Sequence, residues 1–233
     1  MTNVGLKIQS SPAVITIDGP SGTGKGTIAR AISNWLGWHF LDSGALYRVL
    51  GLVVRRDRLD ISDEDQMASI ASNLDVSFVG MEEGTKVYHD GLDCTLAIRT
   101  EECGIVASRI AVFPAVRKAL LSKQHAFRLS PGLVADGRDM GTVVFPDADL
   151  KIFMTASVEE RARRRHNQLK EKEICASLAD LSRDIKERDE RDMAREQSPL
   201  KPSQAAVILD TTAMSIEEVT DNVKILVRKR GLT

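Results

Sequence analysis

Cysteine and histidine are scarce in this chain of 233 residues, which has three cysteines and four histidines. Cys94, Cys103 and Cys175 are odd in number and fit no disulfide or zinc spacing, so we expect reduced thiols, as in a cytosolic protein. The histidines lack the spacing of a zinc protease, and no Ser-His-Asp or Cys-His arrangement is in view. The sequence therefore gives no support for a zinc protease or for a hydrolase with a serine or cysteine nucleophile.

The chain also has almost no net charge and no long apolar run. It carries 32 Lys and Arg against 33 Asp and Glu, a formal net charge of −1, which gives no global attraction to nucleic acid or to a membrane. The N-terminal segment holds no signal-like apolar core, and no apolar run approaches the length of a bilayer. We therefore expect a cytoplasmic protein with neither of those partners.

What the chain does contain is a glycine-rich run that begins two residues after the short apolar segment Val14–Ile17. The run reads Gly19-Pro20-Ser21-Gly22-Thr23-Gly24-Lys25-Gly26-Thr27. A buried strand, such a loop and a following helix form a phosphate cradle, because loop N–H groups, the helix N-terminus and the lysine all present positive charge. The run, called the P-loop below, predicts binding of a nucleoside triphosphate and transfer or cleavage of its terminal phosphoryl group. A glycine-rich turn with a chance lysine is the alternative.

The P-loop departs from the standard pattern at one position. That pattern places Ser or Thr directly after the lysine as a magnesium ligand, whereas here Gly26 follows Lys25 and the hydroxyl comes at Thr27. Because Gly26 has no side chain to offer, we expect Mg²⁺ to sit mostly on phosphate oxygens and water, which suits a cation that keeps its waters.

Alternating strands and helices at both ends of the chain predict an α/β protein with a parallel sheet of about five strands flanked by helices. The hydrophobic content of 42% is ample for its core. We expect strands over 14–17, 38–41, 132–136, 150–154 and 206–209, and helices over 25–36, 45–55 and from residue 215. In such a sheet, ligands bind at the carboxyl ends of the strands.

The middle of the chain breaks this alternation. Short strands over 76–79, 86–89 and 92–95, with turns at Glu83-Gly84 and Asp90-Gly91, predict a small inserted antiparallel sheet. A helix capped by Ser62 is expected before it, and helices near 101–112 and 115–128, separated by Pro114, after it. The polar stretch 158–194 reads as helical and rich in arginine. The insertion and this stretch are expected to close over ligands.

Two groups of polar residues follow core strands. Ser43 and Arg48 come after the second strand and are suited to a second anionic substrate, with arginine as a bidentate fork on phosphate; a helix cap with a surface arginine is the alternative. Asp136 ends a later strand, where phosphoryl-transfer enzymes keep a carboxylate near the metal, often through water. Arg138 is suited to bridge two phosphates and Asp139 to accept hydrogen bonds from a base or sugar; a polar turn with an internal Arg–Asp pair is the alternative.

The polar stretch carries two arginine clusters. Arg188, Asp192 and Arg195 are spaced to share one helix face, where arginines would neutralise a transferring phosphoryl group. Solvated faces with local ion pairs are the alternative, and that alternative is stronger for the other cluster, Arg161 and 163–165.

Together these segments resemble bacterial cytidylate kinases, members of the P-loop nucleoside monophosphate kinase family. The resemblance rests on residues 19–27, 41–48, 135–142 and 186–192, with 208–212 fitting too, and runs from about residue 12 to about 230. It implies one kinase domain over 1–233, with a core of about 12–42, 131–156 and 203–231. A monophosphate-binding insertion of about 43–130 carries the antiparallel sheet, and the helical, arginine-rich lid spans about 157–202.

The resemblance implies transfer of the ATP γ-phosphoryl group to CMP or dCMP with Mg²⁺, giving ADP and CDP or dCDP for pyrimidine nucleotide metabolism. The implied catalytic residues are Lys25, Arg138, Arg188 and Arg195, and ATP binds the P-loop. The implied acceptor residues are Ser43, Tyr47, Arg48, Ser108, Arg117, Arg138, Asp139, Arg188 and Asp192. Asp136 is expected near the metal through water. A closing lid and an inserted subdomain suit a monomer.

Cytosine presents an amino donor and two acceptors, which suit Asp139 with Ser108 and Arg117 respectively, whereas uracil inverts that edge. We therefore predict a preference for CMP over UMP. A kinase for another acceptor such as AMP, UMP or shikimate, a nucleotide-driven switch and a nucleic-acid-binding module remain alternatives. The switch lacks a guanine-reading Asn-Lys-x-Asp string, and the module lacks interleaved aromatics. The choice between CMP and dCMP, and between ATP and GTP, stays open.

Overall fold

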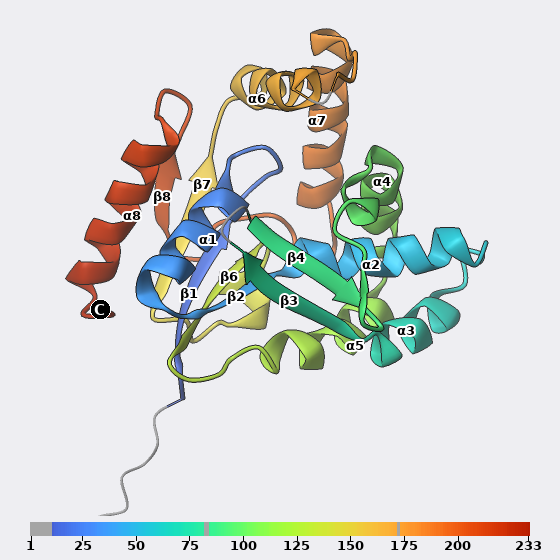
Figure 1. Ribbon diagram of the computed structural model, residues 1–233, viewed down its shortest axis with the longest axis horizontal. Coiled ribbons are helices and arrows are strands. Elements are labelled where there is room, and N and C mark those ends of the chain that lie inside the picture. Colours follow the sequence, from blue (N-terminus) through green and yellow to red (C-terminus); the bar gives the residue numbers. More distant parts are fainter. Residues whose placement is uncertain (1–10, 82–83, 172) are drawn as a thin grey trace, which may run out of the picture.

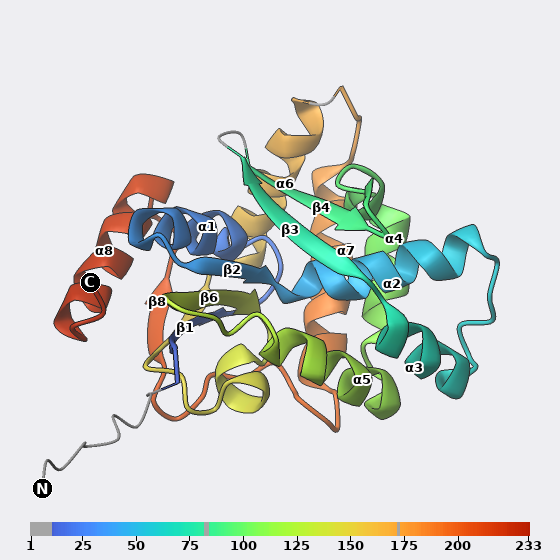
Figure 2. The same ribbon diagram turned by 60° about the horizontal axis from the view of Figure 1, so that its bottom comes forward.

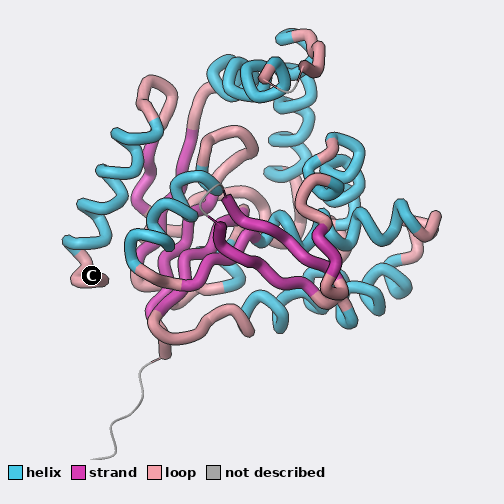
Figure 3. The backbone as a smooth tube through the Cα atoms, viewed as in Figure 1, coloured by secondary structure: helices cyan, strands magenta, loops and turns pink. Residues whose placement is uncertain are grey.

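The computed structural model describes residues 11–81, 84–171 and 173–233. Within them, five strands form one parallel sheet in the spatial order β2-β6-β1-β7-β8. These strands are β1 (Ala13–Asp18), β2 (His39–Asp42), β6 (Gly132–Gly137), β7 (Leu150–Thr155) and β8 (Val207–Asp210). The prediction of a five-stranded parallel sheet is thus confirmed, and Figure 3 shows these strands surrounded by helices.

Helices α1 (Lys25–Leu36) and α8 (Ile216–Lys229) cover one face of this sheet (Figure 1). Ile28 and Ile32 of α1 and a stripe of valines on α8 pack against Ile15, Ile17 and Val134. Gly37 ends α1 in the left-handed conformation, with φ of 66°, as a helix-ending glycine does. Because neighbouring residues of β6 are buried on both faces, the strand shows no apolar–polar alternation, as expected of a covered parallel sheet.

The other face packs against α2 (Ser43–Arg56) and the elements of the insertion. One apolar cluster joins Leu41, Leu133 and Ala135 of the sheet to helices on this side. Those helices are α2, α3 (Glu64–Asn73), α4 (Glu101–Ile110) and α5 (Pro114–His125), with the short turns η1 (Ala97–Arg99) before α4 and η2 (Met140–Val144) after β6. The insertion therefore shares its hydrophobic core with the sheet rather than forming a separate one.

The inserted antiparallel sheet is confirmed. It consists of β3 (Val76–Met81), β4 (Gly84–His89) and β5 (Leu92–Asp93), and Figure 2 shows its hairpin reaching from α1 to α4. Asp90 and Gly91 both have positive φ, 49° and 74°, as the predicted two-residue hairpin turn requires. The last strand ends at Asp93, earlier than predicted, because Thr95 instead accepts a hydrogen bond from the Val87 N–H through its hydroxyl. Glu83, of the other predicted turn, lies outside the described residues.

One helix prediction is corrected, and another is confirmed in more detail. The N-cap of α3 is Asp63, whose carboxylate accepts from the Gln66 N–H at 2.9 Å, while the Ser62 hydroxyl donates to Asp60 at 2.8 Å. The polar stretch 158–194, predicted to be helical, forms two helices, α6 (Val158–Lys170) and α7 (Leu178–Met193). Ser177 caps α7 by accepting from the Asp180 N–H. The two helices stand together beyond the end of β7 (Figure 1).

Candidate active site

The P-loop connects β1 to α1 at the carboxyl end of the sheet. Gly19, Gly22 and Gly24 all have positive φ, and a Cβ at Gly19 would stand 2.2 Å from the Met154 carbonyl oxygen. The loop therefore requires glycine for both its curl and its close approach to β7. Lys25 Nζ donates to the Pro20 carbonyl at 3.1 Å, so the amine lies within the curve of the loop.

Lys25 is held in an environment that disfavours its charge. The side chain is only 8% exposed. Burial, with the Arg138 and Arg188 charges acting the same way, lowers the pKa of Lys25 to about 8, and the Asp136 charge opposes them. A triphosphate placed in the loop would relieve this cost, because its negative charge favours the ammonium form.

Asp136 stands beside the unusual glycine of the P-loop. A Cβ at Gly26 would lie 2.9 Å from Asp136 Oδ2, and Oδ1 is buried with no hydrogen-bond partner among the described residues. Burial raises the pKa of Asp136 to about 7, although Lys25 lowers it. This orphaned oxygen fits a hydrated cation on the phosphates, whereas the described residues contain no group of three or more His, Cys, Asp or Glu placed to hold a metal directly.

A cavity of about 220 Å³ brings the predicted acceptor residues together beside the P-loop. They come from helices α2, α4, α5 and α7, and from the loop after β6. All of the predicted set line it: Ser43, Tyr47, Arg48, Ser108, Arg117, Arg138, Asp139, Arg188 and Asp192, joined by Lys25, Asp136 and Arg195. Segments far apart in the chain therefore converge on one small volume.

One side of this cavity carries the groups predicted to read a base. Arg117 forms an ion pair with Asp139, donates to the Ala111 carbonyl at 3.2 Å and lies 5.9 Å from the centre of the Tyr47 ring. Ser108 Oγ is buried with no partner among the described residues. A hydroxyl, a guanidinium and a carboxylate thus lie close together, which is a donor and acceptor set suited to a polar ring edge.

A second group of residues lining this cavity is organised around Asp192, which is 1% exposed. It accepts from Arg138 Nε at 2.9 Å and pairs with Arg195. Burial would raise the pKa of Asp192, but Arg138 and Arg195 outweigh it and hold the pKa below its usual value. Arg138 is thus paired with Asp192 and Asp139 with Arg117, so the alternative of an internal Arg–Asp pair in the loop is wrong.

Arg188 and Arg195 differ in their placement. Arg188 lies on α7 with Nε buried and unpartnered among the described residues. Burial and the Arg138 charge lower the pKa of Arg188 to about 10. Since α7 ends at Met193, the prediction that Arg195 shares a helix face with Arg188 is wrong. The chain instead turns after the helix and returns the Arg195 guanidinium to Asp192.

Arg48 lies on α2 and lines both of the cavities described here. Its Nη1 donates to the carbonyls of Ile98 at 2.9 Å and Thr100 at 3.3 Å. The predicted bidentate contact with phosphate therefore stays a prediction, while the observed bonds attach α2 to the segment that leads into α4.

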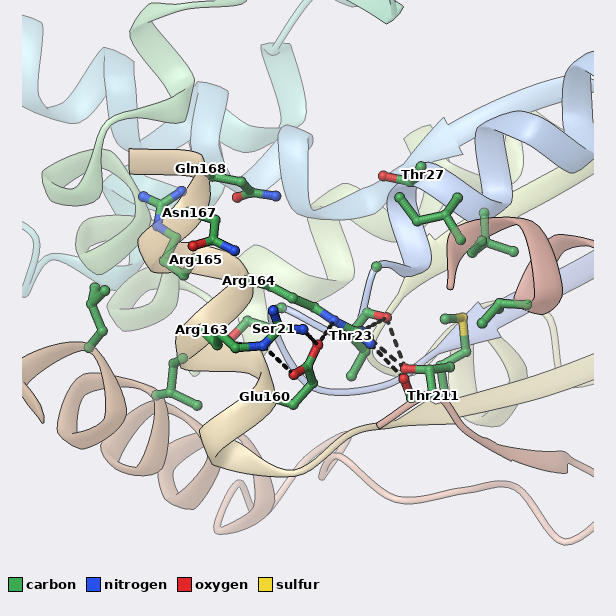
Figure 4. Close-up of a pocket in the computed structure, with 18 of the residues that line it drawn as sticks. Ser21, Thr23, Thr27, Glu160, Arg163, Arg164, Arg165, Asn167, Gln168 and Thr211 are labelled. Atoms are coloured by element: carbon green, nitrogen blue, oxygen red, sulfur yellow. Dashed lines mark hydrogen bonds and ion pairs between the residues drawn. The ribbon is translucent and has the colours of Figure 1, made fainter. Parts of the chain in front are cut away.

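A larger cavity of about 540 Å³ also borders the P-loop and is bounded by α6, α7 and the start of α8 (Figure 4). Sequence reasoning missed three residues that bond to the P-loop near this cavity. Arg164 donates to the carbonyls of Thr23 at 3.3 Å and Thr211 at 2.5 Å, and the Thr211 hydroxyl donates to the Thr23 carbonyl at 3.3 Å. Arg161, 3% exposed, donates to the Ser21 carbonyl at 3.1 Å and pairs with Asp189 at 2.6 Å.

The solvated alternative is therefore wrong for Arg161, which is buried. Arg163 is exposed and forms the local ion pair with Glu160. Arg164 forms a local pair with Glu160 too, at 2.8 Å, and in addition bonds to the P-loop at Thr23. The only sequence signal for Arg161 and Arg164 was their spacing on a helix that follows a core strand.

The two cavities share Ser21, Gly22, Arg48 and Arg188. A P-loop at the carboxyl end of a parallel sheet, bordered by two adjoining arginine-lined cavities, can hold a donor and an acceptor phosphate next to each other. This arrangement defines a P-loop phosphotransferase.

Comparison with known proteins identifies the family. The family model described as "Cytidylate kinase" matches residues 15–229. Cytidylate kinase from Colwellia psychrerythraea is 54% identical over 217 residues, covering 93% of this chain and 96% of that one. Cytidylate kinase from Stutzerimonas stutzeri is 54% identical over 221 residues, covering 94% and 96%. The chain belongs to the cytidylate kinase family and is a nucleoside monophosphate kinase that uses ATP and small-molecule nucleotides.

Among solved structures, a shikimate kinase from Bacteroides thetaiotaomicron overlaps 93% of this chain and 98% of its own, with 14% identity and a TM-score of 0.45. A likeness of that degree adds nothing to the assignment. In the part of the chain that the structure describes, no helix combines the length and apolar character needed to cross a membrane.

Proposed function

We propose that this enzyme transfers the γ-phosphoryl group of ATP to CMP or dCMP, giving ADP and CDP or dCDP for pyrimidine nucleotide metabolism. The observation that carries the proposal is the junction of the two cavities at Gly22 and Arg188, next to Lys25. The larger cavity takes the donor and the smaller one the monophosphate. At their junction the γ-phosphoryl group of one meets the phosphate of the other.

The base is read by Ser108, Arg117 and Asp139. Asp139 and the Ser108 hydroxyl accept hydrogen bonds from the N4 amino group of cytosine, and Arg117 donates to N3 and O2. Uracil has an acceptor at O4 and a donor at N3, so it would leave the buried carboxylate facing an oxygen. Sites built on such hydrogen bonds discriminate by about 10⁴- to 10⁵-fold.

The phosphoryl transfer needs little covalent assistance, because the acceptor phosphate is already an anion at neutral pH. The protein contributes positioning and charge neutralisation. Lys25 and the loop N–H groups hold the β- and γ-oxygens of the donor. Arg138, Arg188 and Arg195 surround the transferring group, and Asp192 keeps two of these guanidiniums in place before substrate arrives.

Mg²⁺ fits this site when it binds together with ATP, the phosphoryl donor. It would neutralise charge on the β- and γ-phosphates when bound, and Asp136, through its orphaned Oδ1, would hold one of its waters. Gly26 leaves the room that this carboxylate occupies.

The domain division follows from the same roles. We assign the core to about residues 12–42, 131–156 and 203–231, the monophosphate-binding insertion to 43–130 and the lid to 157–202. Lid closure would exclude water and suppress ATP hydrolysis. We propose that the enzyme works as a cytoplasmic monomer, which sedimentation at micromolar concentration would test.

The experiment that tests the function measures ADP release from ATP and Mg²⁺ with CMP, dCMP, UMP, AMP, GMP and shikimate, and with no acceptor. We expect strong turnover with CMP and dCMP, weak turnover with UMP and negligible turnover otherwise. Equal rates with CMP and UMP would refute the base assignment. ATP hydrolysis indifferent to every acceptor would refute the kinase reaction and favour a nucleotide-driven switch.

A further inference from the structure

Asp18 occupies a place that the catalytic scheme above does not use. It is the last residue of β1, directly before the P-loop, and is 5% exposed. Its two carboxylate oxygens each accept one backbone hydrogen bond, Oδ1 from the Met140 N–H and Oδ2 from the Gly141 N–H, both at 2.8 Å. The carboxylate thus bonds to a chain segment more than 120 residues away.

The segment that Asp18 holds carries two site residues. Arg138 and Asp139 immediately precede Met140. Arg138 adds a third bond to the same corner, from Nη1 to the Gly19 carbonyl at 3.0 Å. The end of β1 therefore fixes the loop over residues 138–141 through three hydrogen bonds, and with it the positions of a phosphate-facing guanidinium and a base-facing carboxylate.

The packing leaves this segment little freedom to move toward β1. A Cβ at Gly141 would stand 2.8 Å from Thr16 Oγ1 and 3.3 Å from Asp18 Oδ2. Only a residue without a side chain allows the approach that brings both N–H groups to the carboxylate.

The bonding pattern requires a carboxylate. Both oxygens of Asp18 act as acceptors, whereas an asparagine amide offers one acceptor and presents an NH₂ donor to the other N–H. An Asn at this position would lose one bond and face two donors toward each other, and the loop would have to shift. Burial raises the pKa of Asp18 to about 7, and the two N–H groups oppose this rise.

We propose that Asp18 is a positioning residue that sets the loop over residues 138–141 against the P-loop and thereby sets the discrimination between cytosine and uracil acceptors. This rests on the proposed function, because it assumes that Asp139 reads the base. Asp18 lines neither of the two cavities, and in this proposal it acts through the placement of Asp139 and Arg138.

The test compares Asp18→Asn with Thr16→Val in the full-length enzyme. Thr16 lies on the same strand, is fully buried, and its hydroxyl has no partner among the described residues, so valine is a matched control. The measurement is the ratio of kcat/KM for CMP to that for UMP, with ATP binding and the melting temperature measured alongside. We expect Asp18→Asn to lower the ratio at least ~10-fold, the scale of a small misplacement, and Thr16→Val to leave it within about twofold.

A loss of kcat/KM by the same factor for CMP and UMP would overturn the proposal, since general destabilisation does not alter their ratio. A wild-type enzyme without a CMP preference would refute the proposed function instead. If Asp18→Asn does not fold, Gly141→Ala displaces the same loop without changing the carboxylate. A folded Gly141→Ala enzyme with an unchanged ratio counts against the proposal, and a lowered ratio supports it.

Discussion

The carboxylate of Asp136 fills the space that a side chain at Gly26 would need, with Oδ2 only 2.9 Å from the position of a Cβ there. Asp136 sits on β6, the neighbour of β1 in the sheet, in register with Ile17. The hydroxyl expected after a P-loop lysine is therefore replaced in space by a carboxylate from the adjoining strand. The absence of a side chain at Gly26 is therefore what allows the Asp136 carboxylate to occupy this place.

Gly26→Ala should separate activity from stability. The added methyl must displace Asp136, so we expect kcat/KM for ATP to fall ~10- to 100-fold. The same change adds alanine to the first turn of α1, where alanine favours the helix by about 1 kcal/mol over glycine, so the melting temperature should hold or rise. Gly80→Ala is the control, because a Cβ at that position would meet no atom within 4 Å. Normal activity in a folded Gly26→Ala enzyme would contradict the arrangement.

Lys25→Met tests the electrostatic role of the P-loop lysine. Removing one preorganised positive charge from the transferring phosphates costs about 10²- to 10³-fold in rate, so we expect a loss of at least ~10²-fold in kcat with a nearly unchanged melting temperature. Lys118→Met, at an exposed position of α5, should keep full activity. A near-normal rate in the folded Lys25 variant would remove this residue from the mechanism.

The lowered pKa of Lys25 predicts an alkaline limit to donor capture. With a pKa of about 8, the amine is charged below pH 8 and neutral above it. We therefore expect kcat/KM for ATP, which reports the free enzyme, to fall tenfold per pH unit above about pH 8. Because the Asp136 charge raises this pKa, Asp136→Asn should make the fall of kcat/KM begin at lower pH. A profile that stays flat to pH 10 would show that Lys25 titrates normally.

Arg188→Ala should impair turnover more than ATP affinity, because Arg188 lines both cavities and the proposed transfer takes place where these cavities meet. We expect kcat to fall ~10²- to 10³-fold, while the ATP dissociation constant changes by less than ~10-fold. Arg191→Ala, exposed on the same helix, is the matched control and should behave as wild type. A variant that loses ATP affinity but keeps kcat would make Arg188 a ground-state contact.

Local signals predicted the elements that carry the P-loop and the sheet. An apolar strand, a glycine run and a helical apolar stripe are each encoded within a few residues, so β1, α1 and the hairpin turn at Asp90-Gly91 could be located from the sequence. Helix boundaries were less secure. At α3, both Ser62 and Asp63 are good caps, and Asp60 decided between them by accepting the Ser62 hydroxyl.

The predicted acceptor residues were gathered by resemblance and by position, and the structure does bring them to one cavity. Their mutual pairing was beyond local reasoning. Arg117 and Asp139 lie 22 residues apart, and Arg138 and Asp192 lie 54 apart, so no spacing rule applies. The buried role of Arg161 was missed for the same reason, because a helix in isolation presents that arginine to solvent.

The sequence by itself therefore determined the chemistry: a phosphate cradle, an α/β core, and arginines and carboxylates in the segments that become the site. Short-range preferences are enough for this, since they act through neighbouring residues. Only the tertiary structure decided which carboxylate holds which guanidinium, that Asp136 fills the space beside Gly26, and that Asp18 ties the 138–141 loop to the P-loop. Those choices depend on strand order and register, which bring distant segments within hydrogen-bonding distance.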